Sequence, residues 1–212
     1  MSDFFATYGE KLAIAIVTHL LYVAVSVTIG FVIALTLGIA LTRIPRCAKV
    51  ILPVISVFQT VPGIVFIGIL FLYLGMKPIT VIVALSVYAI FPILKNTYVG
   101  ILEVPPQYIE AARGCGMSPV QMLCRVELPL AMPTIIAGLR MATVYTVSWA
   151  VLTAMIGLGG LGEFIYVGVS SNNNILIIAG AVPAAIMAVT LSMIIDRIKK
   201  RLTPRGMGGG EL

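Results

Sequence analysis

The sequence contains several apolar stretches of the kind that cross a lipid bilayer as helices. A helix needs about 20 apolar residues in a row to span about 30 Å of hydrocarbon. Five such stretches cover residues 12–41, 50–74, 79–94, 130–156 and 175–195, and the third is short. Charged residues make up only 10% of the chain, whereas a soluble domain carries about 25%. We therefore predict an all-α membrane protein with five core spans, in which residues 1–212 form a single transmembrane domain.

The second apolar stretch carries a helix-breaking segment. Pro53 and the sequence Gln59-Thr60-Val61-Pro62-Gly63 lie inside it, and proline lacks the backbone N–H that a helix interior needs. The break predicts that this stretch divides into two shorter helices, which leaves a sixth crossing open. Gln59 lies at the break.

Basic residues fall mainly on one side of the predicted spans. Lysine and arginine concentrate in cytoplasmic loops, and only Lys11 and Lys77 lie on the minority side here. The majority side holds Arg43, Arg46, Lys49, Lys95, Arg113, Arg125, Arg197, Lys199, Lys200, Arg201 and Arg205. This asymmetry predicts an N-terminus outside and a C-terminus inside the cell. It also accounts for the formal net charge of +6 without a nucleic-acid partner.

Small residues recur four positions apart in three of the predicted spans. In lipid such stripes mark faces where helices approach closely. The stripes are Ser26, Gly30, Ala34 and Gly38; Gly138, Ala142, Thr146, Ala150 and Ala154; and Gly180, Ala184, Ala188 and Ser192. Packing inside one bundle and packing between two subunits explain these stripes equally well.

Residues 96–129 form the one long polar stretch between predicted spans, on the cytoplasmic side. Pro105 and Pro106 suit the first turn of a helix that runs to Arg113, and Gly114 and Gly116 suit its end. A second helix is predicted to begin with a capping box, in which Ser118 is the cap, Pro119 follows it and Gln121 reaches back. We expect this second helix to stop at Pro129.

The same loop carries a recognisable pattern, Glu110-Ala111-Ala112, then Gly116, then Val126-Glu127-Leu128-Pro129. It resembles the EAA loop of binding-protein-dependent ABC importer permeases, whose pattern is E-A-A, three residues, G, nine residues, I, any residue and L-P. The chain departs from it by Val126 in place of isoleucine. Segments 157–165, 179–185 and 202–206 are similar to permeases for glycine betaine, carnitine and choline.

This resemblance implies the transmembrane domain of a type I ABC importer with a methionine-importer-like architecture, in a bacterial cytoplasmic membrane. Its partners would be a second permease subunit, identical or related, two cytoplasmic ATPase subunits and a separate extracytoplasmic solute-binding protein. ATP and magnesium would bind the ATPase and no cofactor this chain. The implied ATPase-coupling residues are Glu110, Ala111, Ala112, Gly116, Met117, Ser118 and Pro119. The implied cargo is a compatible solute, with another small solute such as an amino acid as the alternative.

Arg140 is an ionisable residue inside the fourth predicted span. An unpaired charge there costs at least ~2.5 kcal/mol, so Arg140 should be paired or hydrated. Two interpretations are open, a pair that fixes the helices or a place on the translocation path. Gln59, Tyr145 and Trp149 are the other candidate residues of that path. Tyr145 and Trp149, with Tyr22, are of the type that could contact a quaternary ammonium cargo, although aromatic residues in membranes more often serve packing.

Several patterns that resemble enzyme motifs lack the context that chemistry needs. Gly157, Gly159 and Gly162 satisfy G-x-G-x-x-G, but they follow a predicted membrane helix rather than a strand, so we interpret them as a flexible extracytoplasmic turn. The chain has no phosphate-binding G-x-x-x-x-G-K-[S/T] sequence, and His19 is its only histidine. We predict a transport subunit that is not an enzyme. A secondary transporter or channel is a remote alternative, because no acidic residue lies centrally in a predicted span.

Overall fold

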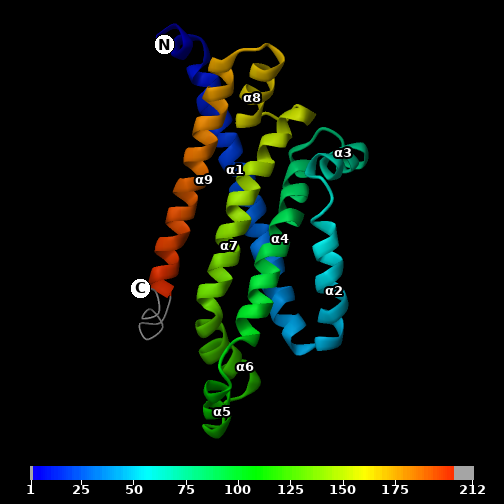
Figure 1. Ribbon diagram of the computed structural model, residues 1–212, viewed down its shortest axis with the longest axis vertical. Coiled ribbons are helices and arrows are strands. Elements are labelled where there is room, and N and C mark those ends of the chain that lie inside the picture. The colour runs from blue at the N-terminus through cyan, green and yellow to red at the C-terminus, as the bar shows by residue number, and fades with distance from the viewer. Residues whose placement is uncertain (1, 203–212) are drawn as a thin grey trace.

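The computed structural model describes residues 2–202 and shows a bundle of long helices (Figure 1). The bundle consists of α1 (Ser2–Arg43), α4 (Pro78–Leu102), α7 (Leu128–Ala150) and α9 (Asn174–Leu202). Its core lies between α1, α4 and α7, where Ala34, Ile93 and Ala142 are fully buried. The sequence similarity at residues 203–206 lies outside the described part of the chain.

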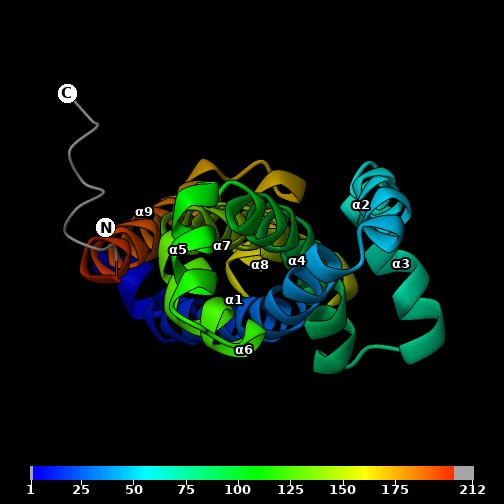
Figure 2. The ribbon, with the colours of Figure 1, turned by 90° about the horizontal axis from the view of Figure 1, so that it is seen from below.

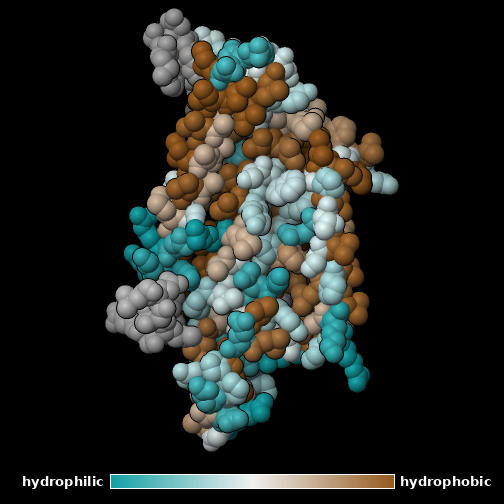
Figure 3. All heavy atoms as spheres, viewed as in Figure 1, coloured by the Kyte–Doolittle hydropathy of each residue, from teal (hydrophilic) through white to brown (hydrophobic). Residues whose placement is uncertain are grey.

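The number of apolar helices agrees with the predicted fold class. Four continuous helical segments are long and apolar enough to cross a membrane, and α2 (Pro45–Phe58) with α3 (Gly63–Leu74) counts as a fifth if the pair is one span. Figure 3 shows hydrophobic side chains over much of α9 and along the edge formed by α2 and α3, and a paler strip over α7 and α4. The apolar surfaces are those expected to face lipid.

The second predicted span is broken where the sequence indicated. The axes of α2 and α3 differ by 93°, and α3 lies crosswise at the side of the bundle instead of along it (Figures 1 and 2). The open possibility of a sixth crossing is therefore not realised. Pro62 is the residue before α3, and its missing N–H and fixed φ favour a chain reversal at this point.

A chain of aromatic rings holds the break against the bundle. The ring centroids of Phe58 and Phe66 are 5.3 Å apart, those of Phe66 and Tyr88 5.6 Å apart, and those of Tyr88 and Trp149 4.9 Å apart. The Tyr88 hydroxyl donates a hydrogen bond of 2.8 Å to the carbonyl oxygen of Val61 inside the break. The orientation of α3 is therefore fixed by side chains of α4 and α7.

The small-residue stripes pack inside this one chain. A Cβ added to Gly30 would lie 2.9 Å from Cβ of Ala89, and one added to Gly38 would lie 2.7 Å from Cγ2 of Thr97. A Cβ added to Gly138 would lie 2.6 Å from Cβ of Asn96 in α4, and one added to Gly180 would lie 2.7 Å from Cγ1 of Ile165. Of the two interpretations, close packing within the bundle is therefore observed at these glycines.

The end of the bundle opposite α5 (Pro106–Gly114) and α6 (Pro119–Met122) contains a turn and a helix, α8 (Leu161–Ser170), that the sequence analysis did not predict. α7 continues into a 3-10 helix, η2 (Val151–Ile156). Gly157, Gly159 and Gly160 then adopt positive φ angles. Gly162 in the first turn of α8 packs closely on η2, since a Cβ there would lie 1.9 Å from the carbonyl oxygen of Val151. The segment around Gly157 to Gly160 is thus a turn as predicted, and its flexibility stays a prediction.

We predict that Gly63→Ala destabilises the protein and that Gly68→Ala does not. A Cβ on Gly63 would lie 2.0 Å from the Trp149 ring, whereas one on Gly68 of the same helix would meet nothing within 4 Å. Overpacking of this kind costs about 1–3 kcal/mol. The measurement is the thermal unfolding midpoint in detergent. Equal midpoints for the two variants would show that Trp149 does not fix α3.

Candidate coupling site

Two short helices project from one end of the bundle, which we call the loop end (Figures 1 and 2). They are α5 (Pro106–Gly114) and α6 (Pro119–Met122). The start of α1 and α8 lie at the opposite end, which we call the far end. The helix, turn and helix predicted from the sequence are therefore present, and they stand clear of the membrane helices.

The end of α5 is closed by backbone hydrogen bonds around Gly116. The N–H of Gly116 donates to the carbonyl of Arg113 at 2.9 Å, and the N–H of Met117 donates to that of Ala112 at 3.1 Å. This pair of bonds is a Schellman motif, which needs a residue in the left-handed region. Gly116 supplies it with a φ of 73°. The predicted role of Gly116 as the turn residue is confirmed.

The start of α6 is closed by the predicted capping box. The backbone N–H of Gln121 donates to the Ser118 hydroxyl at 3.3 Å, and the backbone N–H of Ser118 donates to the Gln121 side-chain oxygen at 2.9 Å. Pro119 occupies the first turn, where its missing N–H costs nothing. Both ends of the turn between α5 and α6 are thus satisfied by groups of the loop itself.

The predicted boundaries of the loop, 96–129, need correction at both ends. Residues 96–102 belong to α4, which ends at Leu102. The second helix does not stop at Pro129, because a π-helical turn, η1 (Leu123–Glu127), joins α6 to α7. The wider hydrogen-bond pattern of a π turn accommodates a residue that lacks an N–H. α6 is therefore the end of a helix that continues through η1 into α7.

The exposed surface of the projecting element comprises only some of the residues that the pattern singled out. Glu110 and Ala111 are exposed, whereas Ala112 is 4% exposed and packs inside the element. Its small side chain therefore serves internal packing. Tyr108 and Val120, which the sequence analysis overlooked, are 47% and 70% exposed. Large apolar side chains exposed beyond the membrane helices are typical of a surface that contacts a partner.

An ion pair that the sequence analysis missed links the loop end to the first helix. Glu127 in η1 is buried, and its two carboxylate oxygens accept hydrogen bonds from both terminal nitrogens of Arg43, the last residue of α1. A buried carboxylate needs a cation, but the two residues lie 84 positions apart in the chain. The sequence indicated this pair only in that Arg43 and Glu127 each lie next to the end of an apolar stretch.

Arg140 has a partner that the sequence did not reveal. Its Nε donates a hydrogen bond of 2.6 Å to the Ser192 hydroxyl and lies 3.5 Å from Oδ2 of Asp196. Both partners belong to α9, so the contact joins α7 to α9. The pairing that the sequence analysis left open is therefore observed, and the role of Arg140 on a translocation path stays a prediction.

The other candidate path residues fall into different surroundings. Gln59 lines a cavity of about 260 Å³ together with Phe58 and Tyr88. Trp149 stacks on Tyr88 and contacts Gly63, which leaves little open ring face for a cation. Tyr145 is 48% exposed on α7. The structure thus places Gln59 and Trp149 near Tyr88, whereas Tyr145 does not line this cavity, and the role of all three on a translocation path stays a prediction.

Comparison with known proteins identifies the family. Residues 26–206 match the family described as the binding-protein-dependent transport system inner membrane component. The chain belongs to this family. It is a permease subunit, a non-catalytic membrane component of an ABC transporter in which a separate ATPase hydrolyses ATP. Its location is accordingly the bacterial inner membrane.

Curated relatives of this permease match along almost its whole length. It is 37% identical to the carnitine transport permease protein OpuCB of Listeria monocytogenes, over 96% of this chain and 94% of the relative. It is also 37% identical to the choline transport system permease protein OpuBB of Bacillus subtilis, over 97% and 94%. The glycine betaine/carnitine/choline permease OpuCB of Bacillus subtilis is 36% identical, over 99% and 96%.

A solved structure shares the fold of the permease. The MetNI methionine ABC transporter in an inward-facing conformation superimposes with a TM-score of 0.83 at 23% identity, over 93% of this chain and 99% of that chain. At this level of identity the likeness shows the fold alone. It confirms the predicted type I importer architecture.

We predict that Arg43→Ala destabilises the permease more than Arg46→Ala. Removal of Arg43 leaves the buried Glu127 carboxylate without its cation, and an orphaned group of this kind costs about 1–3 kcal/mol. The lower part of that range applies, because the Arg43 side chain is 48% exposed and partly screened. Arg46 is exposed on α2. The measurement is the thermal midpoint in detergent, and matching midpoints would refute a stabilising pair.

Proposed function

We propose that this permease is the transmembrane subunit of an ATP-driven importer for a compatible solute, namely glycine betaine, carnitine or choline. The observation that carries the proposal is the set of relatives named above. Three proteins named for these solutes are 36–37% identical to the chain over 96% or more of its length. The three solutes share a trimethylammonium group on a small polar molecule.

The projecting element at the loop end is the proposed docking point for the ATPase. Glu110 offers an exposed carboxylate, and Tyr108 and Val120 offer exposed apolar surface beside it. The proposed coupling residues Met117, Ser118 and Pro119 form the turn that keeps this surface in shape. Because both ends of the turn are closed by its own hydrogen bonds, a push on α5 would move the element as one body.

Two connections would carry that movement into the membrane. One is the continuous helix through η1 into α7, and the other is the contact of Glu127 with Arg43 of α1. At the far end of α7, Trp149 contacts Tyr88 and Gly63 beside the break between α2 and α3. Rigid helices in such contact favour alternating access by movement of whole elements rather than by local unfolding.

The partners of the permease follow from its family, and their arrangement is part of the proposal. We infer two ATPase subunits on the cytoplasmic side, which would bind ATP and magnesium, and a second permease subunit, identical or related. A separate solute-binding protein would deliver cargo from outside. The basic residues at the loop end support an orientation with this end in the cytoplasm and the start of α1 outside.

We expect Glu110→Lys to abolish solute uptake and ATPase retention while the permease still inserts in the membrane. The charge reversal acts on the proposed docking surface, because Glu110 lies exposed on α5. Glu103→Lys is the matched control, since Glu103 is exposed at the end of α4 and lies outside α5. Retention is measured by co-purification in mild detergent. Wild-type uptake and retention in Glu110→Lys would contradict the docking assignment.

The cargo is tested by uptake into proteoliposomes that contain the complete importer and its binding protein. We expect ATP-dependent uptake of radiolabelled glycine betaine, carnitine or choline, with competition among the trimethylammonium compounds. Methionine in excess serves as the control competitor and should leave uptake unchanged. Uptake of an amino acid with no competition by trimethylammonium compounds would support the alternative cargo. Uptake that is independent of ATP would contradict the importer itself.

A further inference from the structure

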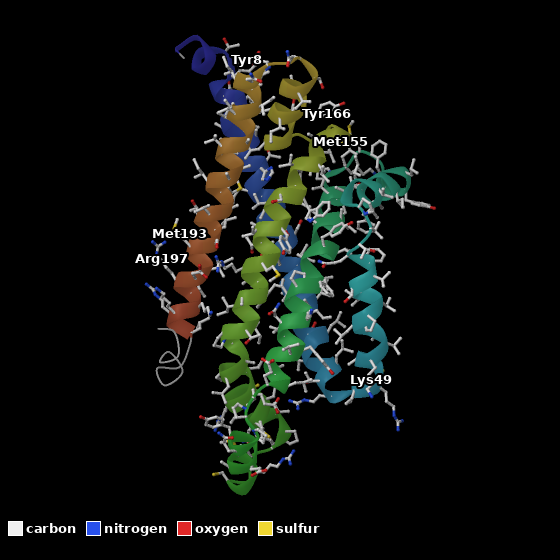
Figure 4. The ribbon with its side chains drawn as sticks, viewed as in Figure 1. Tyr8, Lys49, Met155, Tyr166, Met193 and Arg197 are labelled. Carbon is white, nitrogen blue, oxygen red and sulfur yellow. The ribbon has the colours of Figure 1, made fainter. Side chains whose placement is uncertain are left out.

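A cavity at the far end is not used by the coupling or by the break between α2 and α3. It lies between the first turns of α1 and the helix α8, and it has a volume of about 550 Å³. Tyr8, Lys11 and Ile14 of α1 line one side, and Gly160, Glu163 and Phe164 line the other. Figure 4 shows Tyr8 at this end of the bundle, next to α8 and the start of α9. The volume lies within the range of small-molecule sites.

The cavity lies at the level of a membrane surface. From Lys11 to Arg43 the helix α1 rises about 48 Å at 1.5 Å per residue, whereas the hydrocarbon layer measures about 30 Å. If Arg43 lies at one membrane surface, Lys11 lies in the headgroup layer of the other surface or beyond it. The cavity is therefore accessible to water-soluble molecules and to lipid headgroups.

The cavity carries one positive and one negative side chain that do not pair with each other. Lys11 and Glu163 are both exposed, and the ion pairs found among the described residues are Arg43 with Glu127 and Arg140 with Asp196. Neither Lys11 nor Glu163 makes a side-chain hydrogen bond within the described part of the chain. Two separated opposite charges on one cavity match a ligand that bears both charges.

Aromatic rings complete the lining, and a buried histidine lies behind it. Tyr8 and Phe164 meet edge to face, with ring centroids 6.4 Å apart, and aromatic rings favour ammonium groups. His19 lies behind Gly160, where a Cβ would be 3.4 Å from its Nδ1. Nε2 of His19 faces the Val147 carbonyl at 3.1 Å and so carries the proton. Nδ1 is then a buried acceptor without a hydrogen-bond partner among the described residues.

We propose that this cavity binds a small zwitterion, with its ammonium group against Glu163 and the aromatic rings and its acidic group against Lys11. A purely cationic ligand would leave Lys11 without an opposite charge, and a purely anionic ligand would leave Glu163 without one. The assignment depends on the lining and not on the cargo proposed above.

Two sources provide this chemistry at a membrane surface. A free solute such as carnitine bears a trimethylammonium and a carboxylate group, and phosphatidylethanolamine bears an ammonium and a phosphate group. Both would bridge Glu163 and Lys11. The two sources differ in whether binding persists without zwitterionic lipid, and this difference separates them experimentally.

The test measures binding to the full permease chain in nanodiscs of phosphatidylglycerol, without the binding protein. Radiolabelled carnitine should bind saturably, and Glu163→Gln and Lys11→Gln should each weaken binding roughly tenfold, the loss of one charged contact. Choline, which lacks the acidic group, should respond to Glu163→Gln but not to Lys11→Gln. Glu10→Gln and Lys77→Gln, which change exposed charges outside the cavity, are the matched controls.

A second arm uses nanodiscs that also contain phosphatidylethanolamine, with bound lipid counted by native mass spectrometry. Phosphatidylethanolamine retained by wild-type protein and lost in the two cavity variants supports the site with a lipid headgroup as ligand. Saturable carnitine binding in the first arm supports the site with a free solute as ligand. The proposal is overturned if wild-type protein holds neither ligand, or if the cavity variants behave like the controls.

Discussion

The absence of water from the lipid core governs how this chain interrupts its helices. A backbone carbonyl released at a break has to find a donor within the protein. Three interruptions here have a hydroxyl in place. Tyr88 donates to the carbonyl of Val61 between α2 and α3, Thr80 donates to that of Gly75 before α4, and Thr153 donates to that of Gly159 before α8. At these three places a neighbouring side chain satisfies the irregular backbone.

The sequence predicted the features that depend on near neighbours in the chain. The spans, the break near Gln59, the capping box of Ser118 and the turn at Gly116 all follow from residues a few positions apart. Local signals failed where they were weak or misleading. The helix α8 is short and follows a glycine-rich turn, and Pro129 indicated an end where a π turn carries the helix onward.

Contacts between distant residues could not be predicted from one sequence. The pairing of Arg43 with Glu127 and of Arg140 with Asp196 joins helices whose relative rotation no local pattern specifies. The same holds for Trp149, whose aromatic character indicated both packing and cargo contact until Tyr88 was seen to stack on it. Of the coupling pattern, the sequence located Glu110, Ala111 and Ala112, but only the fold could show that Ala112 points inward.

The closure of the α5–α6 turn by its own hydrogen bonds affects how another subunit would recognise it. A segment that is already ordered loses little conformational entropy on association, so more of the contact energy remains available as affinity. It also presents one fixed shape to every partner. If an ATPase docks on this element as proposed, a preorganised surface of this kind would suit any ATPase subunit of complementary shape.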